Sequence, residues 1–297
     1  MAAGEVVALV GPTGTGKTGV ALALAARWGA EIVNCDSRQV YRGLDIGSAK
    51  PSAAEQAATP HHLFDVVDPD VVFDAARYAA LARAAIADIQ ARGRRVLVVG
   101  GSGLYLRALR RGLFPGPPRD AALRAELEAT EAAAPGALHA RLAAVDPPAA
   151  ARLPAGDRVR LVRALEVLAL TGRPLSVWQA EHRAAADLLP MRVVALRLER
   201  GALQARLDAR CARMLDDGLL DEIRGLWGRG FGPALPALRS IGHREMGAYL
   251  RGTVTPEAAL AAMRLATRQF AKRQGTWFRG EPGVEWLAAD AALTTLS

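Results

Sequence analysis

Short apolar runs alternate with longer amphipathic segments through much of the chain. Each run ends in small or polar residues, which is typical of a buried strand in a parallel sheet. The segments at 17–28 and 74–91 have the length and composition of helices. Strands that alternate with helices predict an α/β fold built on a parallel sheet. The predicted strands lie at 5–10, 31–34, 95–99 and 191–198.

The pattern of apolar and polar positions changes at the proline-rich stretch 115–118, where prolines mark a boundary. From there to Pro190 the pattern predicts helices and no strands, until the strand signal returns at 191. We therefore expect a helical insertion rather than a separate C-terminal domain. The predicted helices are 119–133, 137–144 and 157–171, the insertion is 115–190, and the α/β core comprises 1–114 and 191–297.

One stretch between the first strand and the first helix matches the phosphate-loop motif G-x-x-x-x-G-K-[ST] at every fixed position. Its glycines allow successive backbone N–H groups to point at phosphate oxygens, and the following helix adds its positive end. Lys17 supplies a full charge, and the Thr18 hydroxyl can hold Mg²⁺. The predicted phosphate-binding residues are Gly11, Pro12, Thr13, Gly14, Thr15, Gly16, Lys17 and Thr18.

With this motif in place, the predicted fold is a P-loop NTPase-like parallel sheet core with an inserted all-helical domain. Beyond the last predicted strand the chain is helical. The predicted helices are 203–215, one that follows the loop at 239–245 and ends at about 251, and one from Pro256 to about Trp277. In the last helix Met263, Phe270 and Trp277 recur every seven residues, which predicts a buried stripe.

Two further polar segments follow predicted strands, at the edge of the sheet where ligands of α/β proteins bind. Asp36 follows the strand at 31–34, and Ser102 follows the strand at 95–99 within a glycine-rich turn. Asp36 is a candidate site carboxylate, with a helix N-cap as the alternative. Ser102 is a candidate hydroxyl donor, and a purely geometric turn is equally compatible with the pattern.

The chain is basic, with a formal net charge of +8, which suggests a polyanionic partner such as RNA or DNA. Nearly every positive charge is arginine, so a composition bias explains the total equally well. Arg206 and Arg210 are one helical turn apart and can clamp a diphosphate, or lie on an ordinary surface. The basic, aromatic tail at 272–279 suits a nucleic-acid groove.

The two cysteines, Cys35 and Cys211, lie far apart and form no zinc-binding pattern. The sequence has no predicted signal peptide and no apolar run of membrane-spanning length. We expect a soluble, cytoplasmic protein that does not interact with membranes, and nothing in the pattern demands more than a monomer.

Several separated segments stand out together: GPTGTGKT (11–18), NCDSRQVYRGLDIGSAKP (34–51), PHHLFDV (60–66), GGSGLYLRAL (100–109), DRVRLVRALEVLALTGRP (157–174), SIGHREM (240–246) and RQFAKRQGTWFR (268–279). In this combination the chain resembles one family, the bacterial tRNA dimethylallyltransferases, also called tRNA isopentenyltransferases. The segments span nearly the whole chain in the family's order. The phosphate loop alone is shared with many proteins, whereas its combination with the segment around Asp36 and with the tail is specific.

The resemblance implies a reaction in which dimethylallyl diphosphate gives its prenyl group to N6 of the adenine immediately 3′ of the tRNA anticodon. It implies Mg²⁺ as the cofactor, the phosphate loop as the diphosphate site, and no nucleotide hydrolysis. Asp36 matches the family's base. Ser102 stands where the family usually has threonine, so the hydroxyl is kept but the methyl group is lost. The residues expected to act in catalysis are Asp36, Ser102, Thr18, Arg206 and Arg210.

The resemblance also implies that the helical insertion grips the anticodon stem-loop. The positions that match the family's tRNA contacts are Asp36, Ser37, Arg38, Gln39, Arg124, Arg160, Leu161, Val162, Arg163, Ala164, Arg239, Ser240, Ile241, Gly242, His243 and Arg244. The alternatives are a small-molecule kinase, a prenyltransferase acting on free adenine nucleotides, and an RNA-binding P-loop module without catalysis.

Overall fold

The computed structural model describes residues 5–185 and 188–296, which divide into two compact units, 1–110 with 189–297 and 111–188. The first unit holds a six-stranded sheet in the order β3-β2-β4-β1-β5-β6, with every pair parallel. This confirms the predicted α/β class. The strands are β1 (Val6–Val10), β2 (Glu31–Asn34), β3 (His61–His62), β4 (Val96–Val99), β5 (Arg192–Leu196) and β6 (Val284–Leu287).

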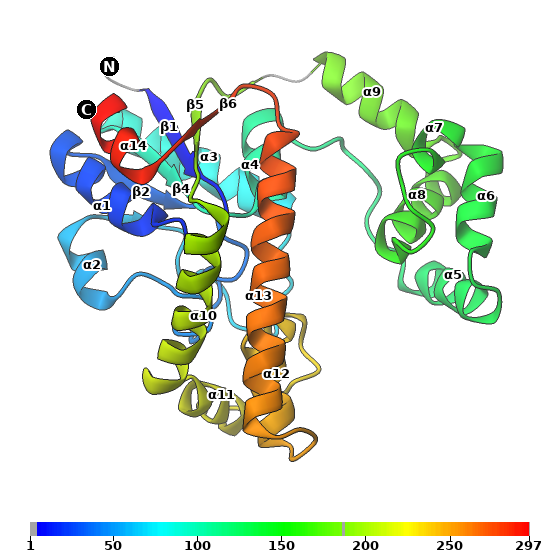
Figure 1. Ribbon diagram of the computed structural model, residues 1–297. Coiled ribbons are helices and arrows are strands. Elements are labelled where there is room, and N and C mark those ends of the chain that lie inside the picture. Colours follow the sequence, from blue (N-terminus) through cyan, green and yellow to red (C-terminus); the bar gives the residue numbers. More distant parts are fainter. Residues whose placement is uncertain (1–4, 186–187, 297) are drawn as a thin grey trace. The chain divides into compact units, whose positions relative to one another are not determined.

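Helices cover both faces of the sheet (Figure 1). Alternate residues of β1 point to opposite sides, so Val7 and Leu9 join one apolar core and Val6 and Ala8 join the other. The first core includes α1 and α14, and the second includes α3 and α4. These helices are α1 (Lys17–Trp28), α3 (Ala75–Ala91), α4 (Gly103–Arg111) and α14 (Ala289–Thr295).

The C-terminal helices of the same unit pack on one another around a further apolar cluster that includes Cys211, Ile223 and Met263. Helices α10 and α13 run side by side along this part (Figure 1). The elements are α10 (Arg200–Asp216), α11 (Leu219–Gly228), a 3₁₀ turn η1 (Pro236–Arg239), α12 (His243–Leu250) and α13 (Pro256–Arg279).

The second unit contains helices and no strands over its described residues, and it has its own core, which includes Leu127, Leu142 and Leu161. Asp120 and Asp157 cap two of its helices by accepting hydrogen bonds from Leu123 N and Arg160 N. The helices are α5 (Ala121–Ala133), α6 (Ala137–Val145), α7 (Pro147–Ala150), α8 (Arg158–Thr171) and α9 (Leu175–Ala185).

Two expectations from the sequence were wrong. The segment 45–62, for which the breakers Pro51 and Pro60 predict a loop, contains α2 (Ala53–Ala58) and β3, because Ser52 and Glu55 form a capping box that starts a short helix. On α13, Met263 is buried, but Phe270 and Trp277 are only partly buried. None of the described helices combines the length and apolar character needed to cross a membrane.

Candidate functional site

Three loops meet at the carboxyl edge of the sheet because the strands before them are neighbours. Strand β4 pairs with β1 on one side and with β2 on the other. The loops that follow β1, β2 and β4 carry the phosphate-loop motif, Asp36 and Ser102 respectively. The structure therefore brings together candidate residues that are far apart in the sequence, from Gly11 to Ser102.

The phosphate loop wraps around the Lys17 ammonium group. Lys17 Nζ donates hydrogen bonds to the carbonyl oxygens of Gly11 at 2.9 Å and Pro12 at 2.8 Å. Gly11 has a φ of +123°, and a Cβ there would lie 2.8 Å from the carbonyl oxygen of Leu196. The first glycine of the motif is therefore required both by its backbone angle and by the close approach of β5.

Burial lowers the pKa of Lys17 to about 8, although the nearby Asp36 carboxylate acts in the opposite direction. The guanidinium of Arg210 repels the ammonium and lowers the pKa further. A cation held away from water beside a second cation has unmet electrostatic demand, which a bound anion satisfies. The loop is thus electrostatically suited to a phosphate group.

Helix α10 covers the phosphate loop and places both candidate arginines against it. Arg210 donates from Nη1 to Thr13 Oγ1 at 3.2 Å, and Arg206 donates from Nη1 to the carbonyl oxygen of Gly14 at 3.4 Å. Burial lowers the pKa of Arg210, whose side chain is partly buried, whereas Arg206 is exposed. Both arginines therefore face the loop, and Arg210 is the more enclosed of the two.

A cavity of about 680 Å³ opens next to Arg210, between α10 and the segment 45–56. Its wall combines three cations with several carboxylates and apolar groups. The lining residues include Lys50, Arg210 and Arg213 together with Asp45, Asp65, Ile46 and Met214.

Asp36 is held in a turn rather than at a helix start, which removes the N-cap alternative. Its backbone N–H donates to Asn34 Oδ1 at 2.9 Å, and its Oδ1 accepts from Arg38 N at 2.8 Å. The Ser102 hydroxyl accepts a hydrogen bond from Ser37 N at 2.9 Å. Ser102 thus fixes the backbone immediately after Asp36.

Gln274 on α13 is a site residue that sequence reasoning missed. Its Oε1 accepts from Thr13 N at 2.8 Å, and its Nε2 donates to the carbonyl oxygen of Gly101 at 2.9 Å. One buried amide therefore joins the phosphate loop to the loop that carries Ser102. The position lies in the matching tail segment, but only the fold reveals that it contacts residue 13.

The aromatic tail is tied to the protein itself. Phe278 is buried, and Trp277 packs so closely on α4 that a Cβ at Gly103 would lie 2.2 Å from its ring. The guanidinium of Arg107 lies 4.7 Å from the centre of the Trp277 ring. The prediction that this tail suits a nucleic-acid groove is therefore not supported for these two aromatic side chains.

The segment 239–244 has exposed residues at its two ends and mostly buried residues between them. Arg239 and Arg244 are exposed, whereas Ser240, Gly242 and His243 are buried. Glu245 holds Arg244 through an ion pair, and its second carboxylate oxygen accepts from Gly242 N at 2.8 Å. Only some of the six predicted contacts therefore present side chains outward.

The helical unit shows the same division. Leu161, Val162 and Ala164 belong to its core, whereas the Arg160 side chain is 68% exposed and pairs with Asp157 at 3.0 Å. Arg124 and Arg163 both bind the carboxylate of Glu166, at 2.7 Å and 2.6 Å, and the Glu166 side chain is fully buried.

The described residues contain no group of three or more His, Cys, Asp or Glu that could hold a metal ion. Thr18 is the second residue of α1 and is partly buried. His61 and His62 are adjacent in the sequence but contact different partners. His62 pairs with Glu31 at 2.7 Å, and His61 lies within hydrogen-bond distance of the carbonyl oxygen of Thr59.

A parallel sheet in which strand β1 leads into a phosphate loop, with a carboxylate after β2 at the same edge of the sheet, defines a P-loop α/β protein. The chain belongs to the IPP transferase family, whose model matches residues 39–281.

The comparisons with individual proteins agree with this membership. A tRNA dimethylallyltransferase of Anaeromyxobacter sp. (strain Fw109-5) is 54% identical over 96% of this chain and 94% of its own length. A tRNA isopentenylpyrophosphate transferase of Bacillus halodurans has a crystal structure that is 38% identical, covers 98% and 94% of the two chains, and has a TM-score of 0.72. A eukaryotic dimethylallyltransferase acting on tRNA is 29% identical over 96% of this chain and 74% of its own, with a TM-score of 0.78.

Proposed function

We propose that this protein is a tRNA dimethylallyltransferase. It transfers the dimethylallyl group of dimethylallyl diphosphate to the exocyclic N6 of the adenine immediately 3′ of the anticodon. A C–N bond forms, the C–O bond to the diphosphate breaks, and N6 loses a proton. The activity named for the relatives, at 54% and 48% identity over nearly the whole chain, supports this assignment.

The observation that carries the proposal is the pairing of a phosphate cradle with a carboxylate. Asp36 is close enough to Lys17 and Arg210 to act on both charges, so one site can hold a diphosphate and a nucleophile's proton acceptor. Adenine N6 is a poor nucleophile because its lone pair is delocalised into the ring. A carboxylate that takes the proton as the C–N bond forms lowers this barrier.

Charge grows on the diphosphate as the C–O bond breaks, and fixed cations beside it stabilise the transition state. Lys17 and the backbone N–H groups of the loop supply this, together with Arg210, which we favour over the exposed Arg206 as the clamp. Ser102 keeps Asp36 in place through its bond to Ser37 N. Serine has the same hydroxyl as the family's usual threonine, so the hydrogen bond from Ser37 N is made without the methyl group.

We assign Mg²⁺ as the cofactor, with Thr18 as its protein ligand. The donor set fits, because Mg²⁺ is commonly held by one or two protein oxygens, substrate phosphate oxygens and water. Among the described residues there is no group of three or more His, Cys, Asp or Glu side chains that could hold the ion, so the oxygens of the diphosphate are expected to complete its coordination. When bound, the ion neutralises part of the charge on the phosphate oxygens.

The target adenine has to leave the anticodon stack to reach Asp36, at a cost of about a few kcal/mol. We assign the grip on the anticodon stem-loop to the helical unit and to the exposed arginines of 239–244. Arg160 and Arg239 are the exposed candidates for phosphate contacts. We expect the protein to act as a monomer.

Purified protein with Mg²⁺ and labelled dimethylallyl diphosphate is incubated with either a tRNA that has adenine after the anticodon or free AMP. We expect label in the tRNA alone, at that adenine after nuclease digestion. Label in AMP would move the function to free nucleotides. No transfer to either, together with ATP turnover in a parallel reaction, would favour a kinase.

A further inference from the structure

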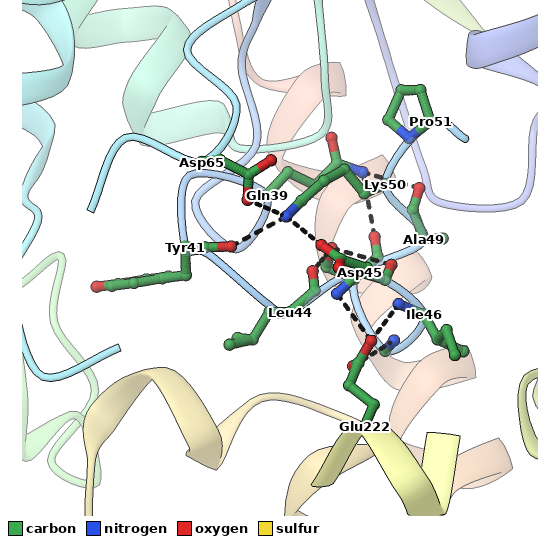
Figure 2. A network of polar contacts seen from close by, with 12 residues as sticks. Gln39, Tyr41, Leu44, Asp45, Ile46, Ala49, Lys50, Pro51, Asp65 and Glu222 are labelled. Carbon is green, nitrogen blue, oxygen red and sulfur yellow. Dashed lines mark hydrogen bonds and ion pairs between the residues drawn. The ribbon is translucent and has the colours of Figure 1, made fainter. Parts of the chain in front are cut away.

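The backbone of the segment after Asp36 is held by a carboxylate from another part of the chain. Glu222 on α11 accepts hydrogen bonds from the N–H groups of Asp45 at 2.9 Å, Ile46 at 2.6 Å and Gly47 at 3.1 Å. Figure 2 shows the Glu222 side chain pointing from its helix into this turn. Three amides that converge on one carboxylate fix the turn more strongly than side-chain packing alone.

His243 lies on the other side of the same carboxylate. Its Nε2 is 2.9 Å from Glu222 Oε1, and its Nδ1 is 3.1 Å from Ser240 Oγ. The His243 side chain is only 1% exposed, and a Cβ at Gly47 would lie 2.2 Å from its Cε1 atom. The histidine is therefore packed between the turn at 45–47 and the start of α12, with no surface left for a bound nucleic acid.

The far end of the turn is anchored by Lys50, whose side chain is only 3% exposed. Lys50 Nζ donates to Asp65 Oδ1 at 2.6 Å and to the carbonyl oxygen of Tyr41 at 3.0 Å, and it also pairs with Asp45 (Figure 2). Ala49 and Asp65 have left-handed φ angles of 51° and 52°. Such angles persist where the surroundings over-determine the backbone.

This anchored turn in turn holds Gln39, one of the residues expected to contact tRNA. Gln39 Nε2 donates to the carbonyl oxygens of Ser48 at 3.1 Å and Ala49 at 2.9 Å. Arg38 donates from Nη1 to the carbonyl oxygen of Pro236, the first residue of the 3₁₀ turn that ends at Arg239, at 3.1 Å. The segments 36–39 and 239–244 are therefore joined through one continuous set of contacts.

We propose that Glu222, supported by His243, is a positioning residue that locks the segments 36–51 and 239–244 together, so that their tRNA contacts are presented in one fixed arrangement. We call the contacts of Glu222 with the turn at 45–47 and with His243 the clamp. The proposal rests on the proposed function, because it assigns the clamp to tRNA binding. It also gives His243 a role within the protein instead of a direct contact with tRNA. The phosphate loop is held separately, by α10 and Gln274, so we expect the contacts of Glu222 to affect tRNA binding more than diphosphate binding.

The clamp works through the charged form of Glu222. Burial acts to raise the pKa of Glu222, but the imidazole of His243 beside it and hydrogen bonds from the backbone N–H groups of Ile46 and Gly47 outweigh burial and lower the pKa. Glu222→Gln keeps the shape but turns an N–H donor toward the amide donors, so part of the clamp is lost. Asp221 is the matched control, because it is the preceding carboxylate on α11 and its side chain is 82% exposed.

The first measurement is amide hydrogen exchange, which needs no substrate. In Glu222→Gln, the amides of residues 45–47 should exchange at least about tenfold faster than in Asp221→Asn. Equal exchange in the two variants would overturn the clamp.

The second measurement is steady-state prenyl transfer to tRNA. Glu222→Gln should raise KM for tRNA at least about tenfold, while the Kd of dimethylallyl diphosphate stays within about twofold of the unaltered protein. A normal KM for tRNA, or an equal loss of diphosphate affinity, would overturn the positioning role. If the unaltered protein modifies no tRNA, the proposed function fails, and with it the tRNA role of the clamp, while the exchange experiment still decides whether the clamp exists.

Gly47→Ala tests the same clamp if Glu222→Gln does not fold. It keeps the carboxylate but pushes a methyl group against His243. We expect the same selective rise in KM for tRNA, and a normal KM together with normal exchange at 45–47 would overturn the proposal.

Discussion

The arginines of the phosphate site and those of the helical unit have the same chemistry but very different partners. At the phosphate loop, Arg206 and Arg210 contact only a carbonyl and a hydroxyl of the loop among their described hydrogen bonds. In the helical unit, Arg124 and Arg163 are bound to the buried carboxylate of Glu166. The first pair keeps charge available for an anion, while the second pair is largely neutralised inside the protein.

The difference shows that an arginine in a segment that resembles the family is available to a ligand only if it is not already paired with a buried carboxylate of the same chain. Arg160 differs from Arg163, three positions later, in this respect. Its partner Asp157 is near the surface, and exposed pairs of this kind contribute only about 0–1 kcal/mol. An anionic ligand can therefore compete for Arg160 at little cost.

The largest effect should come from the carboxylate at the phosphate site. Asp36→Asn removes the proton acceptor, so kcat should fall by about 10²–10⁴-fold with little change in tRNA affinity. Single-turnover transfer and tRNA binding measured on the same protein check this. A fully active variant would exclude Asp36 as the base.

Next in size is the loss of the cation inside the loop. Lys17→Ala should weaken dimethylallyl diphosphate binding by about 10²–10³-fold, because a charge desolvated for an anion is removed. Titration calorimetry measures this, with Lys272→Ala on the exposed side of α13 as the control. Near-normal affinity in Lys17→Ala would contradict the assignment of the loop.

In the helical unit the comparable change should affect stability rather than binding. Glu166→Gln leaves Arg124 and Arg163 without their buried counter-charge, which should cost about 3 kcal/mol of unfolding free energy. Urea unfolding followed by circular dichroism checks it. Diphosphate affinity should not change, and a stable variant would show that the Glu166 pairs contribute little.

The same carboxylate gives the unit a pH dependence. Burial opposes ionisation, but hydrogen bonds from Arg124, Arg163 and Asp120 N lower the pKa of Glu166 to about 2, from about 4.5 in an unfolded chain. Since the folded-state pKa is the lower one, the stabilisation is complete above about pH 4.5 and is lost as the pH falls toward 2. Unfolding measured between pH 5 and 2 should show this loss, and Glu166→Gln should show less of it.

The smallest effect expected is that of Arg160→Ala. Stability should change by no more than about 0.5 kcal/mol, whereas the slope of log affinity for tRNA against log salt should fall by about 0.7–0.9. Arg163→Ala should do the reverse and mainly destabilise the unit. If both variants reduce the salt dependence of tRNA affinity equally, the distinction between the exposed Arg160 and Arg163, which is paired with buried Glu166, is wrong.

The sequence by itself determined the features that depend on neighbours along the chain. The motif at 11–18 and the apolar runs predicted the phosphate loop, four of the strands and the α/β class, since periodicity and glycine spacing are local properties. The short β3 and β6 were missed because their few residues carry no clear alternation. The predicted site residues and the boundaries of the insertion, 115–190, stay predictions, although Asp36, Ser102 and the loop lie at one edge of the sheet.

Only the tertiary structure decided which polar residues lie together at the candidate site and which hold the fold together. Gln274 reaches Thr13 across 261 positions, Arg124 meets Glu166 across 42, and Glu222 holds the turn at 45–47 across about 175. The stripe on α13 failed for the same reason, since its neighbours change along its length from other helices to the phosphate loop. Hydrogen bonds and ion pairs of this kind depend on distance in space, and no local pattern in the sequence records it.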